Sequence, residues 1–280
     1  MDDETVTAQA PPAYLLHLAD NALILGQRNA EWCGHGPVLE EDIAMANISL
    51  DLIGQARLLY QYAAEIINAA SPPDAGPTHI PRPASEDRLA YFRDAPDFRN
   101  YTLLELPHQG PLAPAAGSER DYASTIVCNF LFSAFMSLLW TRLQDSPDTR
   151  LAAIAAKSLK EVRYHLRHAH GWLVRLGDGT NESRRRMQQA LEHLLPYTLE
   201  FWSASAAESA AADNGSAVLP QTFQMAWDSM LDQSLDEATL VRPAPQGPLP
   251  QGKRGIHSEH LSYLLAEMQC VARDHPDARW

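Results

Sequence analysis

The residues with the clearest potential for chemistry lie in one predicted helix, within residues 160–170. Glu161 is followed by Tyr164 at the third position, by His165 at the fourth, and by His168 three residues later. Positions three and four apart lie on one face of an α-helix, so the carboxylate and the imidazoles would point the same way. Two histidines and one carboxylate are typical ligands of non-haem iron. The cluster could hold one metal ion, or Glu161 could form a buried ion-pair and hydrogen-bond network with Arg163, Arg167 or the histidines; we favour the network.

A second polar stripe runs along the helix expected at 39–70, where Asn47, Asp51 and Gln55 follow one another at intervals of four. Two amides and one acid bind iron poorly compared with several carboxylates and imidazoles. We expect this stripe to face water or other polar groups rather than a metal ion. Together with one acid of the first helix, the two stripes give the candidates for a polar core: Asp20, Asn47, Asp51, Glu161, His165 and His168.

The helix expected between these two offers no metal ligand. Residues 122–144 contain no Asp, Glu or His. A di-iron site in a four-helix bundle takes one Glu from each of two helices and a Glu-x-x-His pair from each of the other two. With one helix lacking donors such a site cannot close, so we expect neither catalytic residues nor a metal ion in this chain. The alternative is a self-sufficient di-iron oxygenase whose ligands lie elsewhere in the sequence.

Periodicity of 3.6 residues dominates the chain and strand signals are scarce, which predicts an all-α fold. We expect helices at 13–31, 39–70, 86–92, 119–145, 147–177, 182–214, from 220 onward, and at 258–273. Ser146 should be the N-cap of the fourth long helix with Pro147 at its first position, and Pro196 should kink the fifth. Two long hairpins joined by a crossover predict a ferritin-like four-helix bundle with additional C-terminal helices.

No linker is long enough to force a division, so we expect a single ferritin-like domain over residues 1–280. Residues 1–12 are acidic and end in two prolines, which predicts a disordered tail. The proline-rich residues 71–117 should form the long crossover between the hairpins. Residues 242–256, rich in Pro and Gly, should form a loop before the last helix.

Composition disfavours several classes of function. The formal net charge of −13 argues against binding to nucleic acid, which attracts clustered Lys and Arg, and against an anionic membrane surface. Residues 123–141 are uncharged and long enough to span a membrane, but they include several polar groups and no second span accompanies them; we expect the centre of a bundle. The three cysteines are far apart and the N-terminus lacks a signal-peptide pattern, which indicates a cytoplasmic protein.

Several phrases of the sequence resemble the non-catalytic subunits of phenylacetyl-CoA 1,2-epoxidases, the PaaC family. The resemblance covers nearly the whole chain and is weakest in the crossover. The phrases are DNALILGQR at 20–28, EWCGHGP at 31–37, EDIAMANI at 41–48, DLIGQAR at 51–57, KSLKEVRYH at 157–165, GWL at 171–173, GIHSEHL at 255–261 and LAEMQ at 265–269.

The resemblance implies a ferritin-like subunit of a complex that forms a ring-1,2-epoxide from phenylacetyl-CoA in aerobic phenylacetate breakdown. In that family a related catalytic subunit of the PaaA type holds the two irons, a reductase supplies electrons, and the subunit similar to this chain supports the catalytic one. Where the catalytic relative has the Glu and His of a Glu-x-x-His, this chain has Leu52 and Gln55. With Tyr164, these are the degenerate metal positions.

One basic turn, Gly252-Lys253-Arg254-Gly255, precedes the last helix. We expect an ordinary solvent-exposed loop there. The alternative is that Lys253 and Arg254 contact the phosphates of CoA, because glycine-flanked basic turns can bind phosphate groups.

Overall fold

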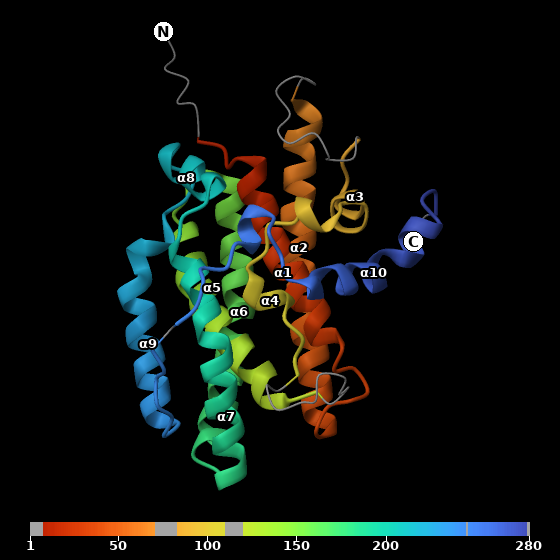
Figure 1. Ribbon diagram of the computed structural model, residues 1–280. Coiled ribbons are helices and arrows are strands. Elements are labelled where there is room, and N and C mark those ends of the chain that lie inside the picture. The colour runs from red at the N-terminus through yellow and green to blue at the C-terminus, as the bar shows by residue number, and fades with distance from the viewer. Residues whose placement is uncertain (1–7, 71–82, 110–119, 245, 279–280) are drawn as a thin grey trace.

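Two antiparallel helix hairpins form the centre of the protein (Figure 1). The computed structural model describes residues 8–70, 83–109, 120–244 and 246–278. In the first hairpin α1 (Pro12–Ala30) packs along α2 (Leu39–Ala69), and in the second α5 (Tyr122–Leu143) packs along α6 (Thr149–Gly177). These parts of the chain contain helices and no strand. The predicted all-α, ferritin-like bundle is confirmed.

α5 is the core helix of the bundle. Within the described residues it is the one helix long and apolar enough to cross a membrane, with a mean hydropathy of 1.6. However, 94% of its apolar window is buried inside the protein. A helix that is apolar on all sides is either a membrane span or the centre of a bundle, and this burial is what the centre of a bundle requires.

α6 begins at a different N-cap from the predicted one. Ser146 was expected to cap it, with Pro147 at the first helical position. Instead Asp148 is the N-cap, and its carboxylate accepts hydrogen bonds from the backbone N–H groups of Arg150 at 3.1 Å and Leu151 at 3.0 Å. A carboxylate at this position also interacts favourably with the helix dipole.

The Asp148 carboxylate also holds the N-terminal segment in place. It accepts hydrogen bonds from the Ala10 backbone N–H and from the Tyr62 hydroxyl, each at 2.7 Å. Ala10 is buried, and α1 already begins at Pro12. The prediction of a disordered tail is therefore wrong for residues 8–12, and its first seven residues lie outside the described part of the chain.

The C-terminal third is more divided than predicted. A single helix kinked at Pro196 was expected over 182–214. The structure has a helix that changes to a 3-10 helix at Leu195, where proline removes a backbone donor, and then a separate short helix. The elements are α7 (Asn181–Leu194), η3 (Leu195–Trp202), α8 (Ala206–Asp213), η4 (Pro220–Phe223), α9 (Gln224–Glu237), η5 (Gly252–Arg254) and α10 (Glu259–Asp274).

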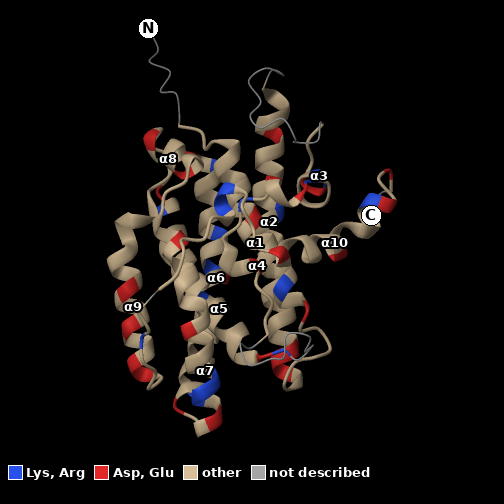
Figure 2. Ribbon diagram, in the orientation of Figure 1, with Lys and Arg blue, Asp and Glu red and all other residues tan. Residues whose placement is uncertain are grey.

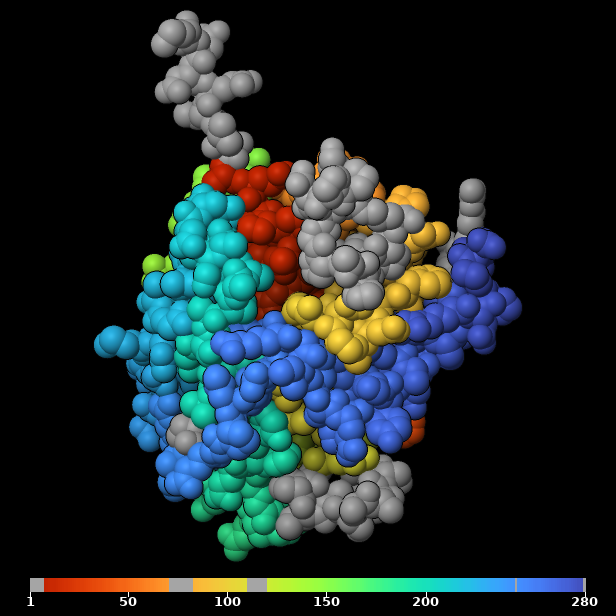
Figure 3. Space-filling view, turned by 45° about the horizontal axis from the view of Figure 1, so that its top comes forward, coloured from red at the N-terminus to blue at the C-terminus, as the bar shows by residue number. Residues whose placement is uncertain are grey.

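The described part of the crossover, residues 83–109, packs against the bundle. It contains α3 (Glu86–Tyr91), η2 (Ala95–Asp97) and α4 (Thr102–Glu105), so the short helix predicted at 86–92 is confirmed. Figure 3 shows the crossover (yellow) beside the C-terminal segment (blue), and α10 contacts α3, η2 and α4. The rest of the predicted crossover lies outside the described residues.

Candidate functional site

Four of the predicted polar residues, Asp51, Glu161, His165 and His168, meet along one line between α2 and α6, which we call the α2–α6 seam; Glu41, which was not predicted, also belongs to it. Three side-chain pairs form it. His168 Nε2 lies 2.8 Å from Glu41 Oε2, His165 Nε2 lies 3.0 Å from Asp51 Oδ2, and the Gln55 amide donates to Glu161 Oε2 at 2.9 Å. Each carboxylate of the seam therefore has a partner on the opposite helix, and the seam joins the two hairpins. Asn47, predicted for the polar core, is exposed on α2 instead.

Glu41 joins a third helix to the seam. Its carboxylate accepts a hydrogen bond from the Tyr122 hydroxyl of α5 at 2.5 Å in addition to its contact with His168. Burial raises the pKa of Glu41, but the hydrogen bonds from Tyr122 and His168 outweigh this, and the net effect is a lowered pKa. Burial and the nearby carboxylate raise the pKa of Tyr122. The pair is thus a carboxylate stabilised by a neutral phenol, which is a structural contact between helices.

The degenerate metal positions do not converge. Leu52 is 2% exposed and lies in the apolar core, where Gly26 of α1 packs closely against it. Gln55 is buried in the seam, whereas Tyr164 is 39% exposed on the surface of α6. The next residue, His165, is buried and points inward, as the histidine of a Glu-x-x-His pair would. A metal ion could not be bound by all three positions.

α1 and α5 are joined by neutral polar groups. The side-chain amides of Asn29 and Asn129 exchange two hydrogen bonds, at 2.8 and 2.9 Å. Beside them the Trp32 indole donates to the Thr125 hydroxyl at 2.9 Å. Amide and hydroxyl groups satisfy one another here without any charge. The sequence showed that this helix lacks carboxylates, but it did not show that Asn129 pairs with Asn29.

These donors do not fit a di-iron centre. The seam carboxylates lie in separate pairs, and α5 contributes only neutral groups, whereas the di-iron cage draws charged ligands from all four helices. Among residues 8–70, 83–109, 120–244 and 246–278, no cluster of three or more His, Cys, Asp or Glu side chains has a geometry that could hold a metal ion. We derive no chemistry through iron for this chain.

Asp20, a further polar-core candidate, binds the crossover. The Arg93 guanidinium donates to both of its carboxylate oxygens, and the Tyr60 hydroxyl (2.5 Å) and the Arg99 backbone N–H (2.8 Å) donate to it as well. Arg93 also lies over the Phe98 ring, with its central carbon 4.3 Å from the ring centroid. Asp20 is therefore fully engaged in holding residues 93–99 against α1.

A second buried polar cluster, which the sequence did not predict, fixes the C-terminal segment. We call it the C-terminal anchor. Glu200 of η3 accepts hydrogen bonds from the backbone N–H groups of Thr102 and Lys253, both at 2.8 Å. Glu208 of α8 accepts from the Lys253 ammonium at 2.9 Å, and Lys253 and Glu208 are each 2% exposed. Burial raises the pKa of Glu200, whereas the pKa of Glu208 is lowered because His17 and Lys253 outweigh its burial.

Lys253 was predicted either to lie in a solvent loop or to contact CoA phosphates, and the structure gives it a different place. Its ammonium is held inside the C-terminal anchor, whereas Arg254 is exposed. The neighbouring glycines explain the turn. A Cβ at Gly252 would lie 2.5 Å from the Asn100 carbonyl oxygen, and Gly255 has a φ of 82°. Only Arg254 of the predicted phosphate contact faces solvent.

His257 fastens the start of α10 to the crossover. Its Nδ1 lies 2.7 Å from Glu105 Oε2 and its Nε2 lies 3.0 Å from the Phe98 carbonyl oxygen. The Glu105 carboxylate also accepts from the Ser258 backbone N–H at 2.6 Å, and the Arg28 guanidinium donates to the Glu105 carbonyl. Both ring nitrogens face oxygen atoms of the crossover, so this histidine joins the start of α10 to two parts of that segment.

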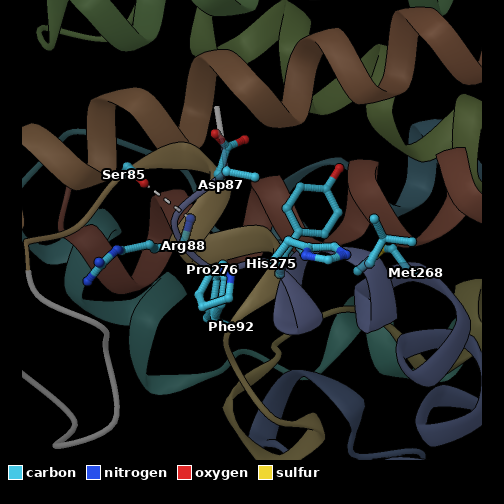
Figure 4. Close-up of a pocket in the computed structure, with 11 residues that line it drawn as sticks. Ser85, Asp87, Arg88, Phe92, Met268, His275 and Pro276 are labelled. Atoms are coloured by element: carbon cyan, nitrogen blue, oxygen red, sulfur yellow. Dashed lines mark hydrogen bonds between the residues drawn. The ribbon is translucent and has the colours of Figure 1, made fainter. Parts of the chain in front are cut away.

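A groove of about 470 Å³ lies between α3 and α10 (Figure 4). Ser85, Arg88 and Phe92 line it on one side, and Met268 and His275 line it on the other. None of the residues predicted for a polar core, a metal site or a phosphate contact lies in this groove. It is therefore separate from the seam and from the C-terminal anchor.

Comparison with known proteins confirms the resemblance found in the sequence. The family described as phenylacetic acid catabolic protein matches residues 2–280. The chain is also 42% identical over 268 residues to the C subunit of the 1,2-phenylacetyl-CoA epoxidase of Escherichia coli (strain K12). This alignment covers 96% of the chain and 98% of the relative.

Proposed function

We propose that this chain, which belongs to the phenylacetic acid catabolic protein family, is a non-catalytic structural subunit of a multi-subunit phenylacetyl-CoA epoxidase. The observation that supports this most strongly is the match to the C subunit of such an epoxidase along almost the full length of both chains. Because the relative is one subunit of a larger enzyme, we expect this chain to assemble with the other subunits of such an enzyme in the cytoplasm.

The partner that we propose is a ferritin-like catalytic subunit that holds the di-iron centre, with a reductase supplying electrons to the assembly. This chain would contribute no cofactor. The paired arrangement of the seam supports the proposal, because each carboxylate there has a polar partner on another helix. Removing one partner of a buried pair leaves a costly unpaired charge, so these residues have a structural reason to be present without any metal.

The experiment is co-expression of the chain with the catalytic subunit of the same organism, followed by affinity purification through a tag on this chain. We expect the two subunits to co-purify and the complex to epoxidise phenylacetyl-CoA when the reductase is added. The chain expressed alone should show no turnover. Failure of the two subunits to co-purify, or turnover by this chain alone, would contradict the proposal.

A second measurement separates the proposal from a self-sufficient di-iron oxygenase. Double substitution of His165→Ala and His168→Ala should leave the turnover of the assembled complex close to the wild-type rate, provided that the variant still folds. If these histidines bound catalytic iron, the same substitution would abolish turnover while assembly remained intact. Assembly is followed by size-exclusion chromatography and folding by circular dichroism.

A further inference from the structure

The outward face of α6 has an unusual charge for this protein. The chain as a whole carries a net charge of −13, yet α6 has Glu161 as its one acidic residue. Its exposed charged side chains are all basic: Lys157, Lys160, Arg163, Arg167 and Arg175. Within the described residues, Lys160 and Arg163 have no ion-pair partner, and Arg167 and Arg175 lie over aromatic rings instead. Positive charges without partners in an acidic protein suggest an anionic group from outside the chain.

The neighbouring face of α2 is apolar. Leu39 is 70% exposed, Ile43 is 54% exposed and Leu50 is 66% exposed. Their spacing of four and seven residues places them on one side of the helix. The exposed acidic residues of α2 are Glu40 and Glu65, which lie near its two ends. Exposed apolar side chains are normal when scattered, but an aligned row marks an interaction site.

The two faces are adjacent, because the α2–α6 seam joins the helices between them. Tyr164 of α6, which is 39% exposed, lies beside the seam, with its ring centroid 6.2 Å from that of His165 and 6.3 Å from that of His168. A helix of the length of α2 extends about 46 Å, and two helices at about 10 Å spacing offer roughly 900 Å². A stable interface needs about 800 Å² from each partner. The contact therefore has to extend along the outward sides of both helices, beyond the apolar row and the basic residues named above.

We propose that the outward faces of α2 and α6 form one docking surface, which binds a part-apolar, acidic helical face of the catalytic subunit. This inference rests on the proposed function. The apolar row of α2 would be buried at the centre of the contact, and the basic side chains of α6 would pair with carboxylates of the partner. By contrast, Figure 2 shows acidic residues (red) along α9, and two of them, Asp228 and Asp232, already bind Arg242.

A second copy of this chain fits the surface poorly. Two such faces brought together would offer few carboxylates to Lys160 and Arg163, because Glu40 at the start of α2 is exposed but Asp51 and Glu161 are already bound in the seam. Uncompensated like charges at an interface are strongly unfavourable. A catalytic subunit with an acidic face would supply carboxylates for these basic side chains, which favours the catalytic subunit over a second copy of this chain.

A pocket at one end of the surface extends it. The pocket has a volume of about 380 Å³, and Val38 of the α2 N-cap and Trp172 of α6 line it together with Trp32 and Tyr122. The rings of Trp32 and Trp172 both meet the Tyr122 ring edge to face, at 5.3 and 5.7 Å. Aromatic pockets that bind one large side chain are typical energetic centres of interfaces. We expect one apolar side chain of the partner to enter it.

The test uses two surface variants of the full-length chain, co-expressed with the catalytic subunit and compared by affinity purification and by the dissociation constant of the purified subunits. One variant reverses charge on α6, Lys160→Glu/Arg163→Glu, and the other removes apolar groups from α2, Ile43→Ser/Leu50→Ser. We expect each to weaken association by at least about tenfold. The wild-type affinity should also fall between about 0.1 and 1 M salt, over which the Debye length shrinks from about 10 to about 3 Å.

Matched controls change similar residues on other faces. Arg184→Glu/Arg185→Glu reverses charge on α7, and Met225→Ser removes an 86%-exposed apolar group from α9. These variants should bind the catalytic subunit within about twofold of wild type. Circular dichroism and thermal unfolding confirm that all variants are folded.

The outcomes separate the two proposals. Wild type that does not bind the catalytic subunit refutes the proposed function. If the wild type binds the catalytic subunit and both surface variants bind it equally well, the docking surface is refuted and the proposed function stays intact. The surface is also refuted if the α6 variant loses only affinity for anionic vesicles, or if the α2 variant loses only self-association of the isolated chain.

Discussion

The buried ion pair of Asp20 and Arg93 should contribute strongly to stability, and the substitution Asp20→Asn tests this. Asn keeps the size of the side chain but removes the charge that faces the guanidinium. The Asp20 side chain is 0% exposed and that of Arg93 is 1% exposed. Leaving one partner of a buried pair without its counter-charge costs about 3–5 kcal/mol. That loss would be a large fraction of a total stability of roughly 5–15 kcal/mol.

We expect the lower half of this range, because the amide oxygen of Asn could still accept the hydrogen bond from the Arg99 backbone N–H. The assay is urea denaturation followed by circular dichroism, with the free energy of unfolding obtained by linear extrapolation. Adding Arg93→Met to Asp20→Asn should restore part of the loss, because a buried pair replaced by apolar groups is often tolerated.

The matched control is Glu182→Gln, which removes one partner of the exposed pair between Glu182 and Arg185 on α7. Exposed pairs contribute about 0–1 kcal/mol, so this variant should unfold at nearly the wild-type urea concentration. A loss from Asp20→Asn no greater than the loss from Glu182→Gln would refute the role assigned to the Asp20 pair.

Three further predictions concern single residues. Burial lowers the pKa of His108 to about 3, so below pH 6.5 the unfolded chain binds a proton that the folded chain does not. The free energy of unfolding should therefore be about 2 kcal/mol lower at pH 5 than at pH 7. Urea titrations at the two pH values check this, and His108→Phe should flatten the pH dependence. Lys253→Met should lower the free energy of unfolding by about 3 kcal/mol, because it leaves the Glu208 carboxylate buried without its cation; a loss below about 1 kcal/mol would contradict this. Arg254→Ala should leave both the apparent KM of the assembled epoxidase for phenylacetyl-CoA and the melting temperature unchanged, as expected of a residue in a solvent-exposed loop, whereas a raised KM would support the alternative contact with CoA phosphates.

The main helices could be predicted from the sequence because their signals are local. Apolar periodicity gave α1, α2, α5 and α6 to within a few residues, and the uncharged residues 123–141 indicated the core helix. The absence of acidic and histidine residues from this core helix is also a local observation. It required only the expected ligand pattern of a four-helix bundle.

The cap of α6 could not be predicted from local rules alone. Ser146 followed by Pro147 matches the usual N-cap pattern. Asp148 is the cap because its carboxylate also binds Tyr62 of α2 and the backbone of Ala10. Such contacts come from segments distant in sequence, which the pattern around residue 146 does not contain.

The C-terminal anchor and the contact between His257 and Glu105 were missed for the same reason. Lys253 and Glu208 are 45 residues apart, and Glu105 and His257 are 152 residues apart. A Lys-Arg pair between two glycines resembles an exposed turn unless the partner of the lysine is known. One signal was present: several acidic and basic residues lie in otherwise apolar segments, such as Glu200 among Leu and Phe residues. Buried charges are rare unless they are paired, so those positions could have been flagged, although their partners could not.

The iron content of the purified proteins tests the central claim most directly, namely that the polar groups of this bundle hold helices together and leave the oxygen chemistry to a partner. The measurement is inductively coupled plasma mass spectrometry on the chain expressed alone in iron-supplemented medium and on its complex with the catalytic subunit. We expect iron near zero for the chain alone and about two iron atoms per catalytic subunit in the complex. About two iron atoms bound to the isolated chain, lost when His165 and Glu161 are replaced, would contradict the claim.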